Sequence, residues 1–406
     1  MNFQGITGIL VLLGIAYLLS NNRKEIKIRT VLWGLGLQFS LALMILKVPF
    51  VKSQFSILDR IFRKIISFSE TGSNFLFESF IPGVGYHVAM MNFAFRALPV
   101  IIFFSSLIAM SYHFGIVQTI VKFISKIMRS TMKTSGPETL SVSANIFVGQ
   151  TEAPIIVRPF IKDMSNSELM AIMTGGFATT AGSVLALYVL WLEKIPGIAG
   201  HMLAASIMSA PAALAIAKII YPETEKSRPK KIIKTHNHRE TQNAMDALGK
   251  GATDGLKLAA NVAAMLIAFV SIISMINYFL DFIFSVSLQQ AMGVIFQPLS
   301  WTMGIPWDEA KIVGSLMGEK IVLTELVAYS NLGNLVNNNL ISNRSAVIAS
   351  YALCGFANFG SIGIQLGGIG GMAPNKRKDL SKIAMKAMIG GALASWLTAT
   401  VAGLLI

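Results

Sequence analysis

Gly149-Gln150-Thr151-Glu152-Ala153-Pro154 interrupts a strongly apolar stretch of the chain, and Thr324-Glu325 interrupts another. Each motif places a carboxylate where the flanking sequence is apolar enough to lie in a membrane. A charged side chain at bilayer depth costs roughly 3 kcal/mol on insertion scales, and it normally faces a bundle interior or a water-filled cavity. Both glutamates are therefore candidate binding residues.

The composition indicates an integral membrane protein. Of 406 residues, 53% are hydrophobic and 13% are charged, whereas soluble domains carry about 25% charged residues. Apolar runs of about 20 residues, enough to cross roughly 30 Å of hydrocarbon, recur along the chain. The net charge is +14, but the basic residues cluster between apolar runs, as the positive-inside rule predicts. We therefore expect a multi-pass protein of the cell membrane, in contact with lipid and not with nucleic acid.

The pattern predicts one all-α polytopic domain with eight transmembrane helices. The expected spans are residues 6–20, 31–48, 88–112, 169–192, 199–220, 256–284, 346–370 and 383–406. Residues 51–68 and 116–128 are amphipathic and are expected to be interfacial helices. Basic turns at residues 23–29 and 376–378 belong in the cytoplasm, which leaves both termini outside.

Four segments organise this domain. Residues 1–80 hold the first spanning helices and an interfacial helix, and residues 81–222 form a first half. A basic cytoplasmic loop is expected over 223–250, and residues 251–406 form the second half.

Each half contains a candidate re-entrant hairpin. Residues 138–160 are apolar but contain the first motif, and basic residues on both sides place both ends in the cytoplasm. The second hairpin is expected over residues 312–335. Backbone broken by Gly and Pro at membrane depth is tolerated only where it is buried in protein or lines a cavity. Hairpin tips are therefore where a binding site is expected.

The two halves share one pattern. Glu152 precedes a small and polar run at residues 179–183, and Glu325 precedes a similar run at 358–361, about 30 residues later in both cases. Matching interrupted segments in two halves indicate the midplane site of a secondary transporter. The flanking charges predict that the hairpins enter from opposite faces, which makes the repeat inverted.

The expected site is polar but carries no basic residue. Its members are Gln150, Thr151, Glu152, Glu325, Asn358 and Ser361. Such a set suits a neutral, hydroxyl-rich or amide-bearing solute, because an anion would lie near two acids without a counterion. A ribose fits, with Glu325 accepting from two vicinal hydroxyls, and Phe356 is available to cover an aromatic base. A purely structural clamp between helices is the alternative.

These motifs, together with Gly318-Glu319-Lys320 and Cys354-Gly355-Phe356-Ala357-Asn358, resemble those of the concentrative nucleoside transporters over residues 82–406. The resemblance implies a homotrimer whose protomers move nucleoside by an elevator-like motion. It also implies that Gln150, Thr151 and Glu152 meet the base, while Glu325, Asn358 and Ser361 meet the ribose.

The same resemblance implies a sodium site. Its ligands would be the side chains of Asn145 and Thr179 and the backbone carbonyls of Val148 and Thr180. Oxygen-only ligation suits a hard alkali cation. One departure is Thr324-Glu325-Leu326, where the family commonly has Asn-Glu-Phe, so the choice between purine and pyrimidine stays open.

Three other functions are weighed against sodium–nucleoside symport. Proton coupling would use Glu152 or Glu325 as the proton carrier, but the retained Asn145 and the hydroxyl of Thr179 favour sodium. An ion channel would need a pore lined by rings of charge or carbonyls. An intramembrane hydrolase would need a nucleophile beside a base, and no histidine accompanies a Ser or Cys motif in the apolar segments. We therefore expect no enzyme and no cofactor beyond the coupling ion.

Overall fold

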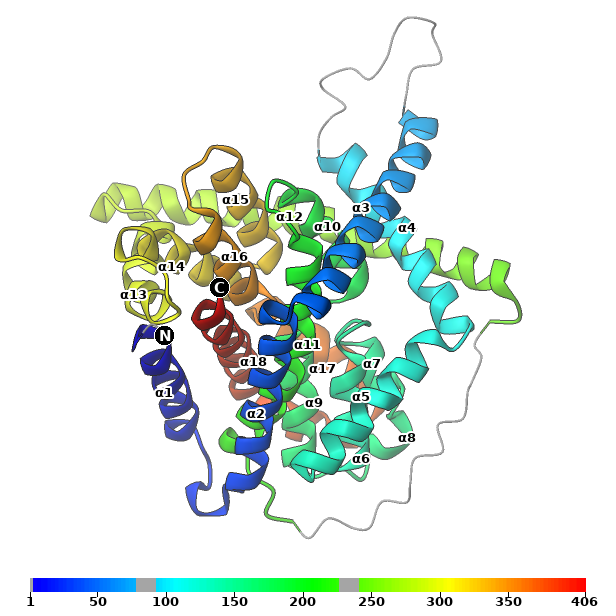
Figure 1. Cartoon of the computed structure of the whole chain (residues 1–406), viewed down its shortest axis with the longest axis vertical. Coiled ribbons are helices and arrows are strands. Elements are labelled where there is room, and N and C mark those ends of the chain that lie inside the picture. Colours follow the sequence, from blue (N-terminus) through cyan, green and yellow to red (C-terminus); the bar gives the residue numbers. More distant parts are fainter. Residues whose placement is uncertain (1–2, 78–92, 226–240) are drawn as a thin grey trace, which may run out of the picture.

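A computed structural model describes residues 3–77, 93–225 and 241–406 of the chain (Figure 1). Within these ranges the regular structure is helical. The N-terminal segment contains α1 (Phe3–Leu18), α2 (Ile28–Lys47) and α3 (Pro49–Phe77). The first half contains α4 (Phe93–His113), α5 (Ile116–Met132), α6 (Gly136–Ala144), α7 (Glu152–Ile155), α8 (Arg158–Ile161), α9 (Asn166–Ala178), α10 (Gly182–Trp191) and α11 (Ile198–Ile220). The second half contains α12 (Ala244–Phe284), α13 (Leu288–Thr302), α14 (Trp307–Val322), α15 (Glu325–Asn337), α16 (Asn343–Leu353), α17 (Phe359–Met372) and α18 (Arg377–Leu405).

Several helices have the length and composition of membrane spans. Five stretches in the described residues pass on both criteria: Ile28–Lys47, Asn166–Trp191, Ile198–Ile220, Ala244–Phe284 and Pro374–Leu405. A sixth candidate is the pair α4 and α5, which is bent by 73°, and α1 is apolar but shorter. The chain is therefore an all-helical membrane protein, and the arrangement with eight spans stays a prediction.

The two predicted interruptions are present. The span expected over 169–192 is divided between α9 and α10 by residues 179–181, which we name break 1. The span expected over 346–370 is divided between α16 and α17 by residues 354–358, which we name break 2.

Both hairpin regions consist of helices joined by short turns. Hairpin 1 comprises α6, α7 and α8 (residues 136–161), and hairpin 2 comprises α14 and α15 (residues 307–337). Ser135 and Glu138 form a capping box at the start of α6, and the side chain of Thr324 caps α15 by accepting from the Val327 amide. Each motif glutamate thus begins the second helix of its hairpin.

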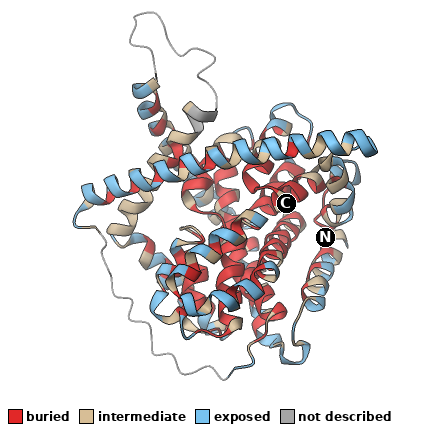
Figure 2. Ribbon diagram, turned by 180° about the vertical axis from the view of Figure 1, so that it is seen from behind, coloured by how far each residue is buried: buried red, intermediate tan, exposed pale blue. Residues whose placement is uncertain are grey.

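The centre of the molecule is formed by α9, α10, α11, α16 and α18, most of whose residues are buried (Figure 2). Small residues permit their close packing. A Cβ added at Gly391 of α18 would lie 2.3 Å from the Cβ of Phe177 in α9. The two central spans α11 and α18 therefore support the broken spans from the inside.

The long helix α12 lies at the periphery and packs along α4 (Figure 2). Their backbones touch at two glycines: a Cβ at Gly251 would lie 2.6 Å from the Cα of Ser106, and one at Gly255 would lie 2.7 Å from the Cα of Ile102. Large apolar side chains such as Tyr278 and Phe282 point outward from α12. This surface suits contact with lipid or with another subunit.

Two findings refine the sequence-based boundaries. Helix α13 lies in a stretch for which no helix was predicted, although Ser287 and Gln290 form a capping box at its start. Helix α12 begins at Ala244, inside the expected loop 223–250, because Asn243 caps it by accepting from the Asp246 amide. The basic residues of that loop at 226–240, and the start of the expected span 88–112, lie outside the described residues.

The N-terminal end of α1 and the C-terminal end of α18 lie together (Figure 1). A Cβ at Gly5 would lie 2.4 Å from the side chain of Leu404. The two ends therefore lie on one side of the molecule, and their placement outside the cell stays a prediction.

Candidate functional site

The two breaks touch each other at the centre of the molecule. The backbone N–H of Gly355 donates to Oγ1 of Thr180 over 3.0 Å. Gly355 has a φ of +93°, and a Cβ there would lie 2.4 Å from the carbonyl oxygen of Phe177. Only glycine combines this left-handed backbone with so close an approach. The crossing therefore fixes break 1 against break 2.

The tip of hairpin 1 lies against break 1. The backbone N–H of Gly182, the first residue of α10, donates to the carbonyl of Phe147 over 3.1 Å. This bond gives a partner to an N–H at a helix N-terminus, which would otherwise have none inside its helix. The polar residues of the hairpin tip and of break 1 are thereby brought to one place.

A chain of hydrogen bonds joins hairpin 1 to α17. Nε2 of Gln365 donates to Oε1 of Gln150 over 3.0 Å, and Nε2 of Gln150 donates to Oγ of Ser361 over 3.2 Å. The backbone N–H of Ser361 in turn donates to Oδ1 of Asn358, which caps α17, over 2.8 Å. All four side chains are buried.

The chain continues from break 2 to hairpin 2 through Glu325. Nδ2 of Asn358 donates to one carboxylate oxygen over 2.9 Å, and the hydroxyl of Tyr188 donates to the other over 3.1 Å. The ring of Tyr188 stacks on Tyr329, with centroids 4.0 Å apart. Hairpin 1, break 2, hairpin 2 and α10 thus contribute to one continuous polar seam, formed by Gln365, Gln150, Ser361, Asn358, Glu325 and Tyr188.

The other expected substrate residues lie beside this seam. Thr151 packs against α17, where a Cβ at Gly368 would lie 2.9 Å from its methyl carbon. Phe356 is half-buried in break 2. The side chain of Glu152 is exposed and folds back on the hairpin tip, so that a Cβ at Gly149 would lie 2.1 Å from its Oε2. The two motif glutamates therefore have different surroundings, one at the surface and one in the interior.

Two members of the seam were absent from the sequence-based set. In the sequence, Tyr188 is not distinguishable from other aromatic residues in apolar spans. Gln365 lies one turn beyond the polar run of break 2. Gln365 had a detectable signal, because it follows Ser361 by four residues and so shares its helix face. Tyr188 had none, since its contact with Glu325 joins segments 137 positions apart.

The residues expected to hold sodium lie at the tip of hairpin 1 and in break 1. Asn145 ends α6 and is 1% exposed, and neither its amide oxygen nor its amide nitrogen has a hydrogen-bond partner. Thr179 is equally buried and donates to the carbonyl of Gly175 over 3.0 Å. Thr180 accepts from Gly355, and Val148 belongs to the hairpin tip. An oxygen such as that of Asn145 is a suitable ligand for a hard cation.

Transition-metal chemistry has no comparable support in the described residues, where no group of three or more His, Cys, Asp and Glu side chains could hold a metal ion. Sodium does not need such a group, because amide, hydroxyl and carbonyl oxygens bind alkali cations.

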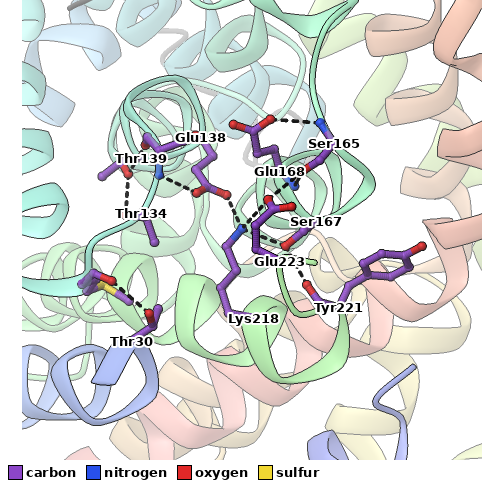
Figure 3. A network of polar contacts seen from close by, with 12 residues as sticks. Thr30, Thr134, Glu138, Thr139, Ser165, Ser167, Glu168, Lys218, Tyr221 and Glu223 are labelled. Carbon is purple, nitrogen blue, oxygen red and sulfur yellow. Dashed lines mark hydrogen bonds and ion pairs between the residues drawn. The ribbon is translucent and has the colours of Figure 1, made fainter. Parts of the chain in front are cut away.

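The base of hairpin 1 is held by a buried lysine of α11 (Figure 3). Nζ of Lys218 lies 2.7 Å from Oε2 of Glu138 and donates to Oγ of Ser167 over 2.9 Å. Glu223, 4.0 Å from the same nitrogen, accepts from the hydroxyl of Ser165 at the start of α9. The network ties α6, α9 and α11 together, and it borders a cavity of about 330 Å³.

A second cavity, of about 420 Å³, lies between α13, α14 and α15, where amide side chains and Glu319 line it together with apolar residues. Neither cavity includes a residue of the seam. The side chains of the seam hydrogen-bond to one another.

Comparison with known proteins identifies the family. Three family models match: Na+ dependent nucleoside transporter N-terminus over residues 7–80, Nucleoside recognition over 94–195, and Na+ dependent nucleoside transporter C-terminus over 201–403. An uncharacterized transporter of Haemophilus influenzae is 41% identical, covering 99% of this chain and 97% of that protein. Sodium/nucleoside cotransporter 1 of Mus musculus is 40% identical, covering all of this chain and 63% of its own length.

Solved structures agree with the sequence comparison. CNTnw in an inward-facing, substrate-bound state is 39% identical with a TM-score of 0.92, covering 99% of this chain and 97% of that one. A CNTnw variant in an outward-facing state gives a TM-score of 0.91 at the same identity and the same coverage of both chains. From its motifs, its fold and these relatives, this chain belongs to the family of sodium-dependent nucleoside transporters.

Proposed function

We propose that this protein is a sodium–nucleoside symporter that binds its substrate along the seam between Gln150 and Glu325. The observation that carries the proposal is that uncharged donors and acceptors surround a single buried carboxylate, to which no basic side chain of the described residues donates. Such a site suits a neutral solute that can both donate and accept hydrogen bonds. Nucleosides meet this description.

The ribose is assigned to Glu325. Both of its carboxylate oxygens already accept one bond each, from Tyr188 and Asn358. A carboxylate offers about four acceptor positions, so it can also accept from two vicinal hydroxyls. The base is assigned to Gln150, Thr151, Glu152 and Phe356. The hydrogen bonds of Gln150 to Ser361 and Gln365 would open to admit it.

Sodium is assigned to the tip of hairpin 1. The buried and unpartnered amide of Asn145 supports this assignment, because burying a polar group without a partner costs free energy that an ion would offset. Thr179 and the carbonyls of Val148 and Thr180 would complete the ligands. The ion would then tie the hairpin tip to break 1 and organise the residues that follow it, from Gln150 onward.

Alternating access is expected to be an elevator-like motion. Relatives of this fold occur in inward-facing and outward-facing states. The broken spans and α6 of hairpin 1 pack on α11 or α18, whereas α12 packs mainly along α4, which also contacts α10. We propose that the first group moves against this pair, that the hairpins are re-entrant from opposite faces, and that the exposed apolar face of α12 contacts lipid and neighbouring subunits in a homotrimer.

Uptake of radiolabelled uridine and adenosine into proteoliposomes tests the proposal. We expect accumulation under an imposed sodium gradient and none under a proton gradient alone. Accumulation driven only by protons would transfer the coupling to a glutamate, and a non-saturating current would indicate a channel. Failure to accumulate either nucleoside under both gradients would overturn the substrate assignment.

A further inference from the structure

Lys320 places an amino group in the interior of the second half. It lies in the last turn of α14 and is 0% exposed. Its ammonium nitrogen donates to the carbonyls of Ala352 (3.0 Å) and Cys354 (2.8 Å) and to the hydroxyl of Ser395 (2.8 Å). An ammonium group has three donors, and each has a partner here.

The partners explain what the charge does. Ala352 and Cys354 lie at the C-terminal end of α16, where the helix stops inside the protein and break 2 begins. The last four carbonyls of a helix accept no hydrogen bond from within the helix, and they carry the partial negative charge of its dipole. Lys320 satisfies two of these carbonyls and connects them to hairpin 2. Burying an ammonium group is costly unless it is fully hydrogen-bonded. The hydrogen bonds to α16 are therefore what permits a lysine at this position.

The corresponding place in the first half has no such group. In hairpin 2, Lys320 lies in the last turn of the first helix, five residues before Glu325. In hairpin 1, Asn145 ends the first helix, seven residues before Glu152. Residues 136–152 contain no lysine or arginine. Where the second half has an ammonium bound by oxygens, the first half has an unpartnered amide.

We propose that Lys320 is a tethered cation, which does for hairpin 2 and break 2 what the sodium ion does for hairpin 1 and break 1. It is a positioning residue, because its contacts lie beside the seam and hold the backbone that presents Phe356 and Asn358. This inference rests on the proposed sodium site for its comparison. It implies that the second half is organised permanently and that only the first half responds to an ion from solution.

Chemical rescue distinguishes a tethered cation from a side chain that merely fills space. In Lys320→Ala the missing atoms correspond to n-propylammonium, so this ion is added to the full-length variant, with n-propanol as the uncharged control. We expect sodium-driven uridine uptake to fall at least about tenfold, and n-propylammonium to restore part of the uptake and raise the unfolding midpoint in detergent. Lys311→Ala, an exposed lysine of the same helix, should leave both quantities unchanged and insensitive to the amine.

A second variant keeps the test decisive if the alanine variant is unstable. Lys320→Met preserves the volume without the charge, and we expect it to lose uptake and not to be rescued by the amine. Wild-type uptake by Lys320→Met, or equal rescue by n-propanol and n-propylammonium, would overturn the proposal. The amine-dependent shift in unfolding midpoint can be measured whether or not transport depends on sodium. If uptake by the wild type did not depend on sodium, the proposed function would be wrong, and the shift would still test the role of Lys320.

Discussion

The two halves of the molecule share one architecture but differ in how the tip of the hairpin is bound to the interrupted span. In both, a helical hairpin ends against a span that is interrupted at its middle. In the second half the tip of the hairpin is bound to the break by the ammonium of Lys320. In the first half the buried lysine, Lys218, lies at the opposite end of the hairpin (Figure 3). The tip of that hairpin has the unpartnered Asn145.

This difference indicates how one fold gives unequal roles to two similar hairpins. Hairpin 1 is anchored at its base through Lys218 and Glu138, so its tip is the part that an ion from solution can organise. Hairpin 2 is anchored at its tip, and its base is held more simply by Glu309, which accepts from the backbone and hydroxyl of Ser342. The ribose side of the site would then be preformed, and the base side would depend on sodium.

The largest expected effect comes from disrupting the contact that joins the halves. Gly355→Ala would require a left-handed backbone for alanine and would place a Cβ 2.4 Å from the carbonyl of Phe177. We expect a loss of about 2–6 kcal/mol of stability, or no folded protein, measured by thermal unfolding in detergent. Gly371→Ala, whose Cβ would meet nothing within 4 Å, is the matched control. Equal stability of the two variants would show that the breaks need not touch.

Glu325→Gln removes the charge on the ribose side. A neutral amide cannot accept from two hydroxyls as a carboxylate does, so we expect uridine uptake to fall at least about 100-fold. Glu193→Gln, an exposed position in the turn before α11, should transport normally. Near-normal uptake by Glu325→Gln would contradict the ribose assignment.

Glu152→Gln provides the comparison within the first half. Glu152 is an exposed residue whose carboxylate folds back on the hairpin tip, so we expect a smaller loss than for Glu325→Gln, where the residue is buried. A larger loss would reverse the roles given to the two halves.

Asn145→Ala tests the ion-dependent half alone. We expect the sodium concentration for half-maximal uptake to rise by about tenfold or more, as for loss of a group that supports metal binding. The control is Ser141→Ala, one turn earlier on α6, whose hydroxyl is also buried without a partner. If both variants kept the wild-type sodium dependence, the ion would have to bind elsewhere.

The smallest effect is expected for Tyr188→Phe. The change deletes one hydrogen bond to Glu325 and keeps the stacking on Tyr329. Such a bond contributes modestly, so KM for uridine should rise by about 3–10-fold with little change in thermal unfolding. An unchanged KM would remove Tyr188 from the substrate site.

The sequence was most informative where a local rule was broken. Carboxylates, glycines and prolines in apolar segments predicted both helix breaks to within a few residues, because such residues are costly at membrane depth. The re-entrant course of the two hairpins stays a prediction. Helix α13 was missed although its capping box was visible. Contacts such as Tyr188 with Glu325, or Lys218 with Glu138, could not be predicted, because they depend on which helices cross and not on any nearby pattern.

The central claim is that one half of the molecule takes a free cation and the other carries its own. The most direct test is the slope of sodium activation of uridine uptake in proteoliposomes, for the wild type and for Lys320→Ala without added amine. The account predicts a Hill coefficient of about one for the wild type, because a single half offers an open ligand set. A wild-type coefficient near two that falls to one in Lys320→Ala would place a second sodium ion in the second half and would contradict the account.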